Sequence, residues 1–401
     1  MRPNKAFDHE TRRRLYAERL EHVRAHMSTR GVGAMVLLDP ASIRYVTGSS
    51  NMENFSVRVP ARYLLVLEPG PTVLYEYRGC EHLGIGLPTV TDVRLAEGLD
   101  VVSSDDDVDG SCHRFADEIV GVIRDVDRSI DRIAIDRLPF QAVDELRRYG
   151  FTLTDANQVL VPARARKLPI EIDFMREVMR RTELAVAEME QALVPGATEA
   201  EVWAIFHRGH IAREGEYTVS RLLQSGPRTY PYFQECSDRQ LVVGDLVCLD
   251  TDAVGLEGYC ADFSRAFLCG DGVATAAQRS LYAKAREQLE WNAALLIPGV
   301  TFEEIAQRAW PIPPEHLDSR YYCIGHGLGI AGDFPNIPHP RSDGPYPVNG
   351  PLEPGMVFCI ESYIGSSQLG QGAKLEDEFL ITTTGAERIS QYPFDPRLGG
   401  A

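Results

Sequence analysis

The sequence lacks several features that would identify particular classes of protein. Its eight cysteines include no CxxC pair, which argues against a zinc framework and, in a chain of 401 residues, against a disulfide scaffold. Basic residues are scarce, because 41 Lys and Arg stand against 58 Asp and Glu and give a net charge of −17. Nucleic acids and anionic membranes favour a basic protein face, so neither is expected as a partner.

Long apolar stretches are also missing. No run of apolar residues approaches the roughly 18 that a membrane span needs. The N-terminal stretch MRPNKAFDHETRRRLYAERL has no apolar core of the kind found in secretory signals. Scattered cysteines are typical of reduced thiols inside a cell. The sequence therefore predicts a cytoplasmic protein, and its 44% apolar and 25% charged residues are ordinary for a globular one.

The pattern along the chain predicts two domains. Residues 10–30 have a charged helical pattern, GAMVLLDP reads as a buried strand, and ARYLLVLEPGPTVLYEYRG reads as two strands joined by a Pro/Gly turn. These segments and the strands that follow them predict a smaller α/β domain over residues 1–160. The second predicted domain covers residues 161–401 and begins with a long helix over about 169–193.

Two segments of the second domain resemble each other. VPGATEAEVWAIF (194–206) and IPGVTFEEIAQRA (297–309) both follow a long helical pattern and both contain Pro-Gly-x-Thr. In each, the threonine (Thr198 or Thr301) can cap a new helix, and Glu201 or Glu304 completes a capping box three residues later. Such a cap is common enough to recur by chance, but the preceding long helices favour a duplicated half-domain.

The stretch CLDTDAVGLEGYCADFSRAF (248–267) places three aspartates on two predicted strands of one hairpin. Asp250 and Asp252 are two residues apart, so on a regular strand they would project to the same face. Asp262 follows on the second strand. Carboxylates among apolar neighbours are costly unless a cation or a hydrogen-bond donor pairs with them.

Three later segments add further ligand-type residues. YYCIGHGLGI contains His326, LEPGMVFCIESY contains Glu361, and GAKLEDEFLIT contains Glu376. One imidazole with several carboxylates is the donor set of a dinuclear site for Fe, Zn, Mn or Co. Taken singly, each acid could instead be solvated or paired with an arginine, as Asp262 could be with Arg265, and His326 could be a turn residue.

The order of these residues resembles the creatinase/prolidase/methionine-aminopeptidase family, and the likeness covers nearly the whole chain. GYCADFSRAF and LEPGMVF match strands and turns of that family. The resemblance implies an α+β pita-bread catalytic domain after a creatinase/prolidase-like N-terminal domain, two divalent metal ions and a homodimer. It places the metal ligands at Asp252, Asp262, His326, Glu361 and Glu376, and the resemblance to one lyase branch of the family adds Asp250.

Two histidines of the family's peptidases are absent from this sequence. The first lies where SGPRTYPYFQEC has Tyr232 or Phe233, and the second where HGLGIAGDFP has Asp333, seven residues after His326. In the family these histidines help to bind and protonate a peptide. Their absence argues against hydrolysis of Xaa-Pro bonds.

The departures resemble a lyase branch of the family that acts on dimethylsulfoniopropionate (DMSP). The shared segments include SGPRT, FQEC, DTD, KLEDEFLIT and YPFDPRLGG. In this branch the catalytic aspartate comes six residues after the histidine, where this chain has Gly332, so Asp333 is shifted by one residue. The resemblance also places a functional tyrosine at Tyr321 and an aromatic residue at Phe55.

Three functions stay open at this point. The first is a metal-dependent lyase in which Asp333, or failing it Tyr321, removes a proton from DMSP or a related small zwitterion. The second is an Xaa-Pro peptidase or a hydrolase of an osmolyte C–N bond, and the third is a binding protein without catalysis. A substrate cation would favour aromatic faces, although these rings could also be ordinary core residues. The aromatic candidates are Phe55, Tyr232, Phe233 and Tyr321.

Overall fold

The computed structural model describes residues 7–340 and 346–399. The chain divides into two compact units, Met1–Arg164 and Ala165–Ala401. This division lies four residues beyond the position 160 at which the sequence predicted it. None of the helices in the described ranges is long and apolar enough to cross a membrane.

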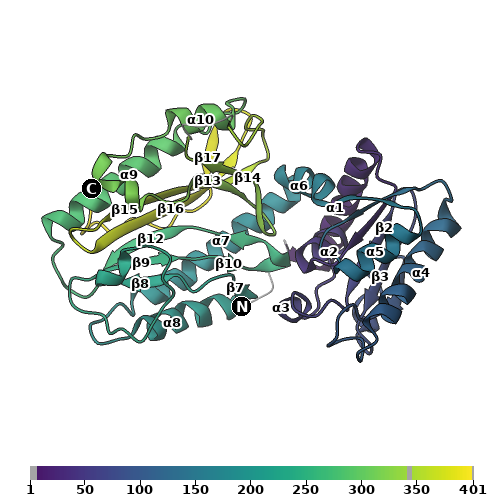
Figure 1. Ribbon diagram of the computed structural model, residues 1–401. Coiled ribbons are helices and arrows are strands. Elements are labelled where there is room, and N and C mark those ends of the chain that lie inside the picture. Colours follow the sequence, from purple (N-terminus) through teal and green to yellow (C-terminus); the bar gives the residue numbers. More distant parts are fainter. Residues whose placement is uncertain (1–6, 341–345, 400–401) are drawn as a thin grey trace. The chain divides into compact units, whose positions relative to one another are not determined.

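The N-terminal unit is a mixed six-stranded sheet with helices packed against it (Figure 1). The strand order is β4-β3-β2-β1-β5-β6, and the paired Tyr63–Leu67 and Thr72–Glu76 are the two strands predicted around the Pro/Gly turn. Its elements are α1 (His9–Thr29), β1 (Ala34–Leu37), α2 (Pro40–Thr47), α3 (Glu53–Ser56), β2 (Tyr63–Leu67), β3 (Thr72–Glu76), β4 (Asp92–Leu95), α4 (Val108–Val126), β5 (Arg132–Ile135), α5 (Phe140–Arg148), β6 (Thr152–Asp155) and α6 (Asn157–Ala165).

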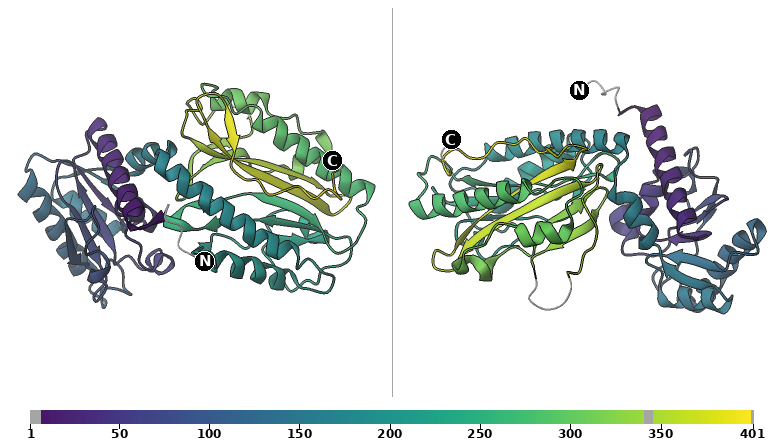
Figure 2. Two further views of the ribbon diagram at one scale, coloured as in Figure 1. Left: turned by 180° about the vertical axis from the view of Figure 1, so that it is seen from behind. Right: turned by 90° about the horizontal axis from the view of Figure 1, so that it is seen from above.

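The C-terminal unit is built around a curved antiparallel sheet with two long helices, α7 and α9, beside it (Figures 1 and 2). The strand order is β14-β13-β15-β16-β12-β9-β8, with β17 paired to β16, and β11-β10-β7 form a second small sheet. Its helices are α7 (Pro169–Glu190), α8 (Glu199–Ile211), α9 (Ala276–Ala293) and α10 (Phe302–Arg308). Its strands are β7 (Tyr217–Thr218), β8 (Leu223–Ser225), β9 (Leu246–Asp250), β10 (Ala253–Val254), β11 (Cys260–Ala261), β12 (Ser264–Leu268), β13 (Cys323–Leu328), β14 (Gly332–Pro338), β15 (Val357–Ser366), β16 (Gln371–Ile381) and β17 (Ala386–Arg388).

The two Pro-Gly-x-Thr segments fold alike. Both predicted capping boxes are confirmed, at the start of α8 and at the start of α10. Gly196 and Gly299 adopt φ values of 92° and 90°, a left-handed conformation that glycine enters at little cost. Each glycine also donates its backbone N–H to a leucine carbonyl, that of Leu241 in one copy and that of Leu352 in the other.

Replacing Thr198 by Ala should lower the stability of the C-terminal unit by about 1 kcal/mol, because the hydroxyl that accepts the Glu201 N–H is removed. Urea unfolding followed by circular dichroism would measure the effect. Thr301→Ala is the matched variant and should have a similar effect, since it removes the same contact to Glu304. An unchanged midpoint in both variants would show that these caps do not contribute to stability.

Strands β15 and β16 separate an apolar face from a polar one. On β15, Phe358, Ile360 and Ile364 belong to the hydrophobic core that contains α9 residues, and on β16 the core members include Leu375 and Phe379. Successive residues of a strand point to opposite faces. Glu361 and Glu376 therefore point away from that core, and both are buried.

Candidate metal centre and cavity

Sheet register brings the predicted acidic residues together from distant parts of the chain. Asp250 pairs with Ser264, Ser264 pairs with Glu376, and Glu376 pairs with Glu361. These four residues form one row across β9, β12, β16 and β15. Strands in a sheet lie about 4.8 Å apart, so the row gathers three carboxylates within a few ångströms of one another.

His326 on β13 faces this row. Its Nε2 lies 3.4 Å from Oε1 of Glu361, and 3.9 Å from both Oδ2 of Asp262 and Oε1 of Glu376. The structure thus brings four predicted ligands to one point, although they span 114 residues of sequence. Asp262 lies between β11 and β12, where the chain turns into the site.

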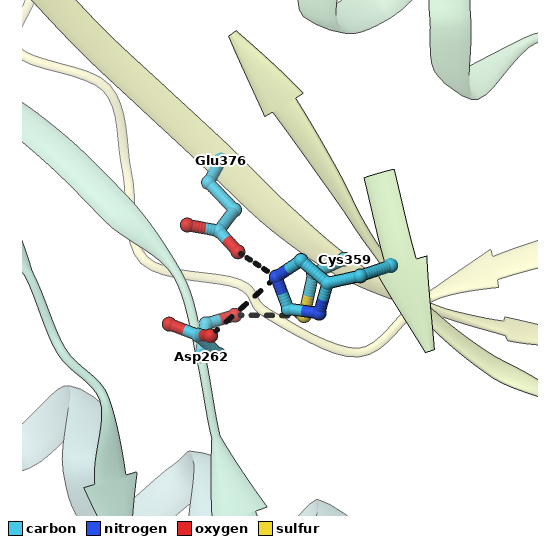
Figure 3. Close-up of side chains that lie close together, drawn as sticks. Asp262, Cys359 and Glu376 are labelled. Atoms are coloured by element: carbon cyan, nitrogen blue, oxygen red, sulfur yellow. Dashed lines mark hydrogen bonds and ion pairs between the residues drawn. The ribbon is translucent and has the colours of Figure 1, made fainter. Parts of the chain in front are cut away.

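Cys359 is a further member of this group that the sequence analysis did not identify. Its Sγ, His326 and the carboxylates of Asp262 and Glu376 all offer ligand atoms within 4.8 Å of one another (Figure 3). Cys359 precedes Glu361 by two residues on β15, so strand alternation places both on the same face. That spacing was the available signal.

Lys374 is a second residue beside the predicted ligands that the sequence analysis did not identify. Its Nζ lies 2.6 Å from Oε2 of Glu361, 2.8 Å from Oε2 of Glu376 and 3.3 Å from Oδ2 of Asp250. The side chain is completely buried, and the three carboxylates outweigh the cost of burial and raise the pKa of Lys374 well above its ordinary value. Each glutamate therefore directs one oxygen to Lys374 and the other to His326.

The carboxylates are nevertheless short of positive charge. Burial, followed by the neighbouring carboxylates, raises the pKa of Asp262 and of Glu376 well above the ordinary range. Among the described residues, Oδ1 of Asp262 and Oε1 of Glu376 are buried and accept no hydrogen bond. Buried acceptors of this kind are costly without a partner. One imidazole and several carboxylate oxygens with unsatisfied lone pairs fit a divalent transition-metal ion.

The positions of Asp250 and Asp252 differ from the expectation that both project from one strand. Strand β9 ends at Asp250, and Asp252 has a φ of 40° in the left-handed region, so strand alternation does not apply to the pair. Asp252 accepts a hydrogen bond from Ser220, and burial together with the charge of Asp250 raises the pKa of Asp252 to about 6. Both aspartates still line the same cavity.

Asp250 is held by two donors. Its Oδ2 accepts the Tyr232 hydroxyl at 2.7 Å and lies 3.3 Å from Nζ of Lys374. Burial would raise the pKa of Asp250, but Lys374 and the Tyr232 hydroxyl outweigh it, so the pKa lies below the ordinary value. Tyr232, a predicted substrate contact, is therefore engaged in holding an aspartate.

Replacing Asp250 by Asn should weaken metal binding by about 10-fold or more, since the change removes one negative charge from the cluster and loosens Lys374. Metal affinity would be measured by competition with a chromogenic chelator. Tyr232→Phe is the control, because it removes only the hydroxyl contact to Asp250 and should have a smaller effect. Wild-type affinity for all ions in Asp250→Asn would exclude Asp250 as a ligand.

A cavity of about 420 Å³ opens above the carboxylates. One wall is aromatic and includes Phe233, Tyr321 and Tyr322. The lining also includes the acidic and imidazole groups of Asp252, Asp262, His326 and Glu361. An anionic group of a ligand could therefore meet bound metal in this cavity while a cationic or apolar group meets aromatic rings.

Asp333 also lines this cavity, and it forms an ion pair with a lysine that the sequence analysis did not consider. Oδ2 of Asp333 lies 3.1 Å from Nζ of Lys167, and both side chains are buried. Lys167 lies 166 residues earlier in the chain, so the motifs around His326 could not indicate it. The ion pair fixes the position of the carboxylate.

Phe55 belongs to the N-terminal unit. It packs against Tyr77 with ring centroids 5.6 Å apart and lines a separate hollow of that unit together with Val59 and Arg78. Its predicted contact with substrate stays a prediction.

Comparison with known proteins places these features in context. The model of metallopeptidase family M24 matches residues 173–383, and the creatinase/prolidase N-terminal domain matches residues 19–165. The dimethylsulfoniopropionate lyase DddP of Roseovarius nubinhibens is 35% identical over 376 residues, which cover 92% of this chain and 84% of that protein. DddP of Roseobacter denitrificans is 33% identical, with 94% and 85% covered.

Peptidases are related more distantly. The probable dipeptidase PepE of Mycobacterium bovis is 29% identical, with 65% of this chain and 64% of that protein covered. Among solved structures, the prolidase from Pyrococcus horikoshii OT3 matches with a TM-score of 0.76 at 20% identity and covers 94% of this chain and 99% of its own. That likeness establishes a shared fold.

Proposed function

Since this chain belongs to metallopeptidase family M24 and carries a creatinase/prolidase N-terminal domain, we propose that it is a metal-dependent carbon–sulfur lyase that converts DMSP to dimethyl sulfide and acrylate. The predicted fold, an α+β pita-bread domain preceded by a creatinase-like domain, is confirmed by these matches and by the prolidase structures. The two lyases named DddP support the proposed reaction.

The observation that carries the proposal is the replacement of a histidine in the cavity by a carboxylate. Of the described residues that line the cavity, His326 is the one histidine, and it faces the acidic cluster. Asp333 lies where the resemblance puts a second peptidase histidine. A carboxylate can accept a carbon-bound proton, whereas an amide leaving group needs a proton donor. The cavity is therefore better suited to elimination than to amide hydrolysis.

DMSP suits the two kinds of side chain that line this cavity. It has a carboxylate at one end and a dimethylsulfonium at the other. We place the carboxylate toward Asp252, Asp262, His326 and Glu361 and the sulfonium toward the aromatic wall. When bound to these residues, metal ions supply Lewis acidity that stabilises the negative charge developing on the substrate carboxylate.

Asp333 is the proposed base. It removes the proton α to the carboxylate, and the C–H electron pair becomes the new carbon–carbon double bond. The C–S electron pair leaves with sulfur, so that neutral dimethyl sulfide and acrylate form and the proton stays on Asp333 until it passes to solvent. Lys167 holds the carboxylate in place throughout, 3.1 Å from Oδ2. Tyr321 is the alternative base.

Two divalent ions per chain are part of the proposal, with Fe, Zn, Mn or Co as candidates. The family is metal-dependent, and the six proposed ligands include five carboxylates. One of their five negative charges is balanced by the buried Lys374. The remaining four equal the charge of two divalent cations, which supports a dinuclear site. Elemental analysis and anomalous scattering would establish the number and identity of the ions.

An Xaa-Pro dipeptidase or aminopeptidase, or a hydrolase acting on an osmolyte C–N bond, is the second candidate. It is favoured by the retained ligand set and by the likeness to dipeptidases. Gas chromatography for dimethyl sulfide, run beside a proline-release assay on Ala-Pro and Gly-Pro, separates the two candidates. Proline release without dimethyl sulfide would overturn the lyase proposal. A cytoplasmic location and a homodimer complete the proposal, and the dimer is testable by light scattering.

A further inference from the structure

The aromatic residues around the cavity form a continuous cluster, but only some of its rings already lie beside a positively charged side chain. Ring centroids of Tyr321 and Tyr322 lie 4.9 Å apart, those of Phe233 and Tyr321 lie 5.2 Å apart, and those of Phe233 and Tyr322 lie 6.2 Å apart. Tyr232 packs behind them, 4.8 Å from Phe233. Each ring could in principle attract the cationic end of a substrate.

Two of the rings already face a cation of the protein. Nζ of Lys374 lies 4.8 Å from the centroid of Tyr321 and 5.6 Å from that of Tyr232. Lys374 is fixed there by Glu361, Glu376 and Ser264. A second cation beside these two rings would meet repulsion from the lysine in a poorly solvated region, where charges interact strongly. The rings of Tyr232 and Tyr321, called the inner rings below, are therefore poor binding sites for a substrate cation.

Phe233 and Tyr322 lack such a competitor. No lysine or arginine in residues 7–340 and 346–399 lies over either ring, and both side chains are 54% exposed and line the cavity. Phe233 has a φ of 65°, a left-handed conformation that is unfavourable for an aromatic residue. Such conformations persist where the surrounding structure enforces them, and ligand contacts are a common setting.

We propose that Phe233 and Tyr322 form the binding site for the substrate's cationic group and so determine specificity for a sulfonium or quaternary ammonium zwitterion. This inference rests on the proposed function, because it assumes that the substrate carboxylate binds at the metal centre. It differs from the sequence-based expectation in two ways. Tyr322 is added, and Tyr232 and Tyr321 serve as inner rings that hold Lys374.

Two unreactive probes of the same shape test whether Phe233 and Tyr322 bind the cationic group. In 3-(trimethylammonio)propanoate the terminal group is cationic, and in 4,4-dimethylpentanoate a carbon atom replaces the nitrogen and removes the charge. Calorimetry on the metal-loaded full chain should show the wild type binding the cationic probe about 10-fold more tightly than the neutral one. Tyr322→Ala should lose most of this preference, and Tyr322→Phe should keep it because the ring is retained.

Phe233→Leu is the second variant and should also reduce the preference while leaving metal content unchanged. A Tyr322→Ala protein that weakens both probes equally, or neither, would overturn the inference, because a purely structural role does not distinguish charge. The proposed reaction is tested separately by dimethyl sulfide release from the wild type. If the wild type discriminates between the probes but releases no dimethyl sulfide, the proposed reaction is rejected and the cation-binding site is retained. If the wild type releases dimethyl sulfide but both variants discriminate as well as it does, the reaction is retained and the cation-binding site is rejected.

Discussion

Replacing Asp333 by Asn should reduce acrylate formation at least about 100-fold, the lower end of the loss expected when a general base is removed. Asn keeps the size of the side chain but cannot accept the α-proton. The metal ligands are not altered, so metal content should stay at the wild-type level. Acrylate and bound metal are measured on the same preparation, by chromatography and by elemental analysis.

The ion pair with Lys167 determines the control for this experiment. Asp333→Asn leaves a buried ammonium without its carboxylate, and an unpaired buried charge can cost about 3–5 kcal/mol of stability. The double variant Lys167→Met/Asp333→Asn removes that charge and should be folded, metal-loaded and equally inactive. Lys167→Met alone retains the base but loses the ion pair that positions it. Its turnover should therefore lie between that of the wild type and that of the double variant. Near-normal acrylate formation by the double variant would exclude Asp333 and make Tyr321 the next candidate.

Replacing Glu376 by Gln should abolish both metal binding and activity. Glu376 lies at the centre of the row, with one oxygen 3.9 Å from His326 and the other 2.8 Å from Lys374. Gln removes a negative charge where the cluster must offset the charge of divalent ions. Asp262→Ala should behave in the same way. Loss of metal should also lower the melting temperature. A ligand that binds only the folded state adds about 2.7 kcal/mol of stability when its free concentration is 100 times its Kd.

Glu378→Gln is the matched control on the same strand. Glu378 is buried two residues beyond Glu376, and burial raises the pKa of Glu378 to about 8. Burial thus disfavours the charged form of this carboxyl, and Gln is its uncharged counterpart of similar size. This variant should retain metal and most of the activity. A Glu376→Gln protein with full metal content would contradict its proposed role as a ligand, whatever its activity.

Much of the architecture could be predicted from local patterns. The hairpin strands, the long helix that begins at Pro169 and the caps at Thr198 and Thr301 depend on neighbouring residues. Short-range periodicity and capping chemistry report such features directly. Asp252 shows where the local pattern fails. Its left-handed backbone ends the alternation on which the expectation of a shared strand face with Asp250 depended.

The sequence by itself predicted a donor set of one histidine and five carboxylates, in an order typical of a metal centre. Only the tertiary structure decided how these groups are paired. Lys167 reaches Asp333 across 166 residues, and Lys374 holds Asp250 across 124 residues of chain. Contacts of this kind depend on sheet register and on how side chains from separate strands face one another, and no local periodicity encodes them. The same placement of Lys374 decides which aromatic rings are left for a substrate cation.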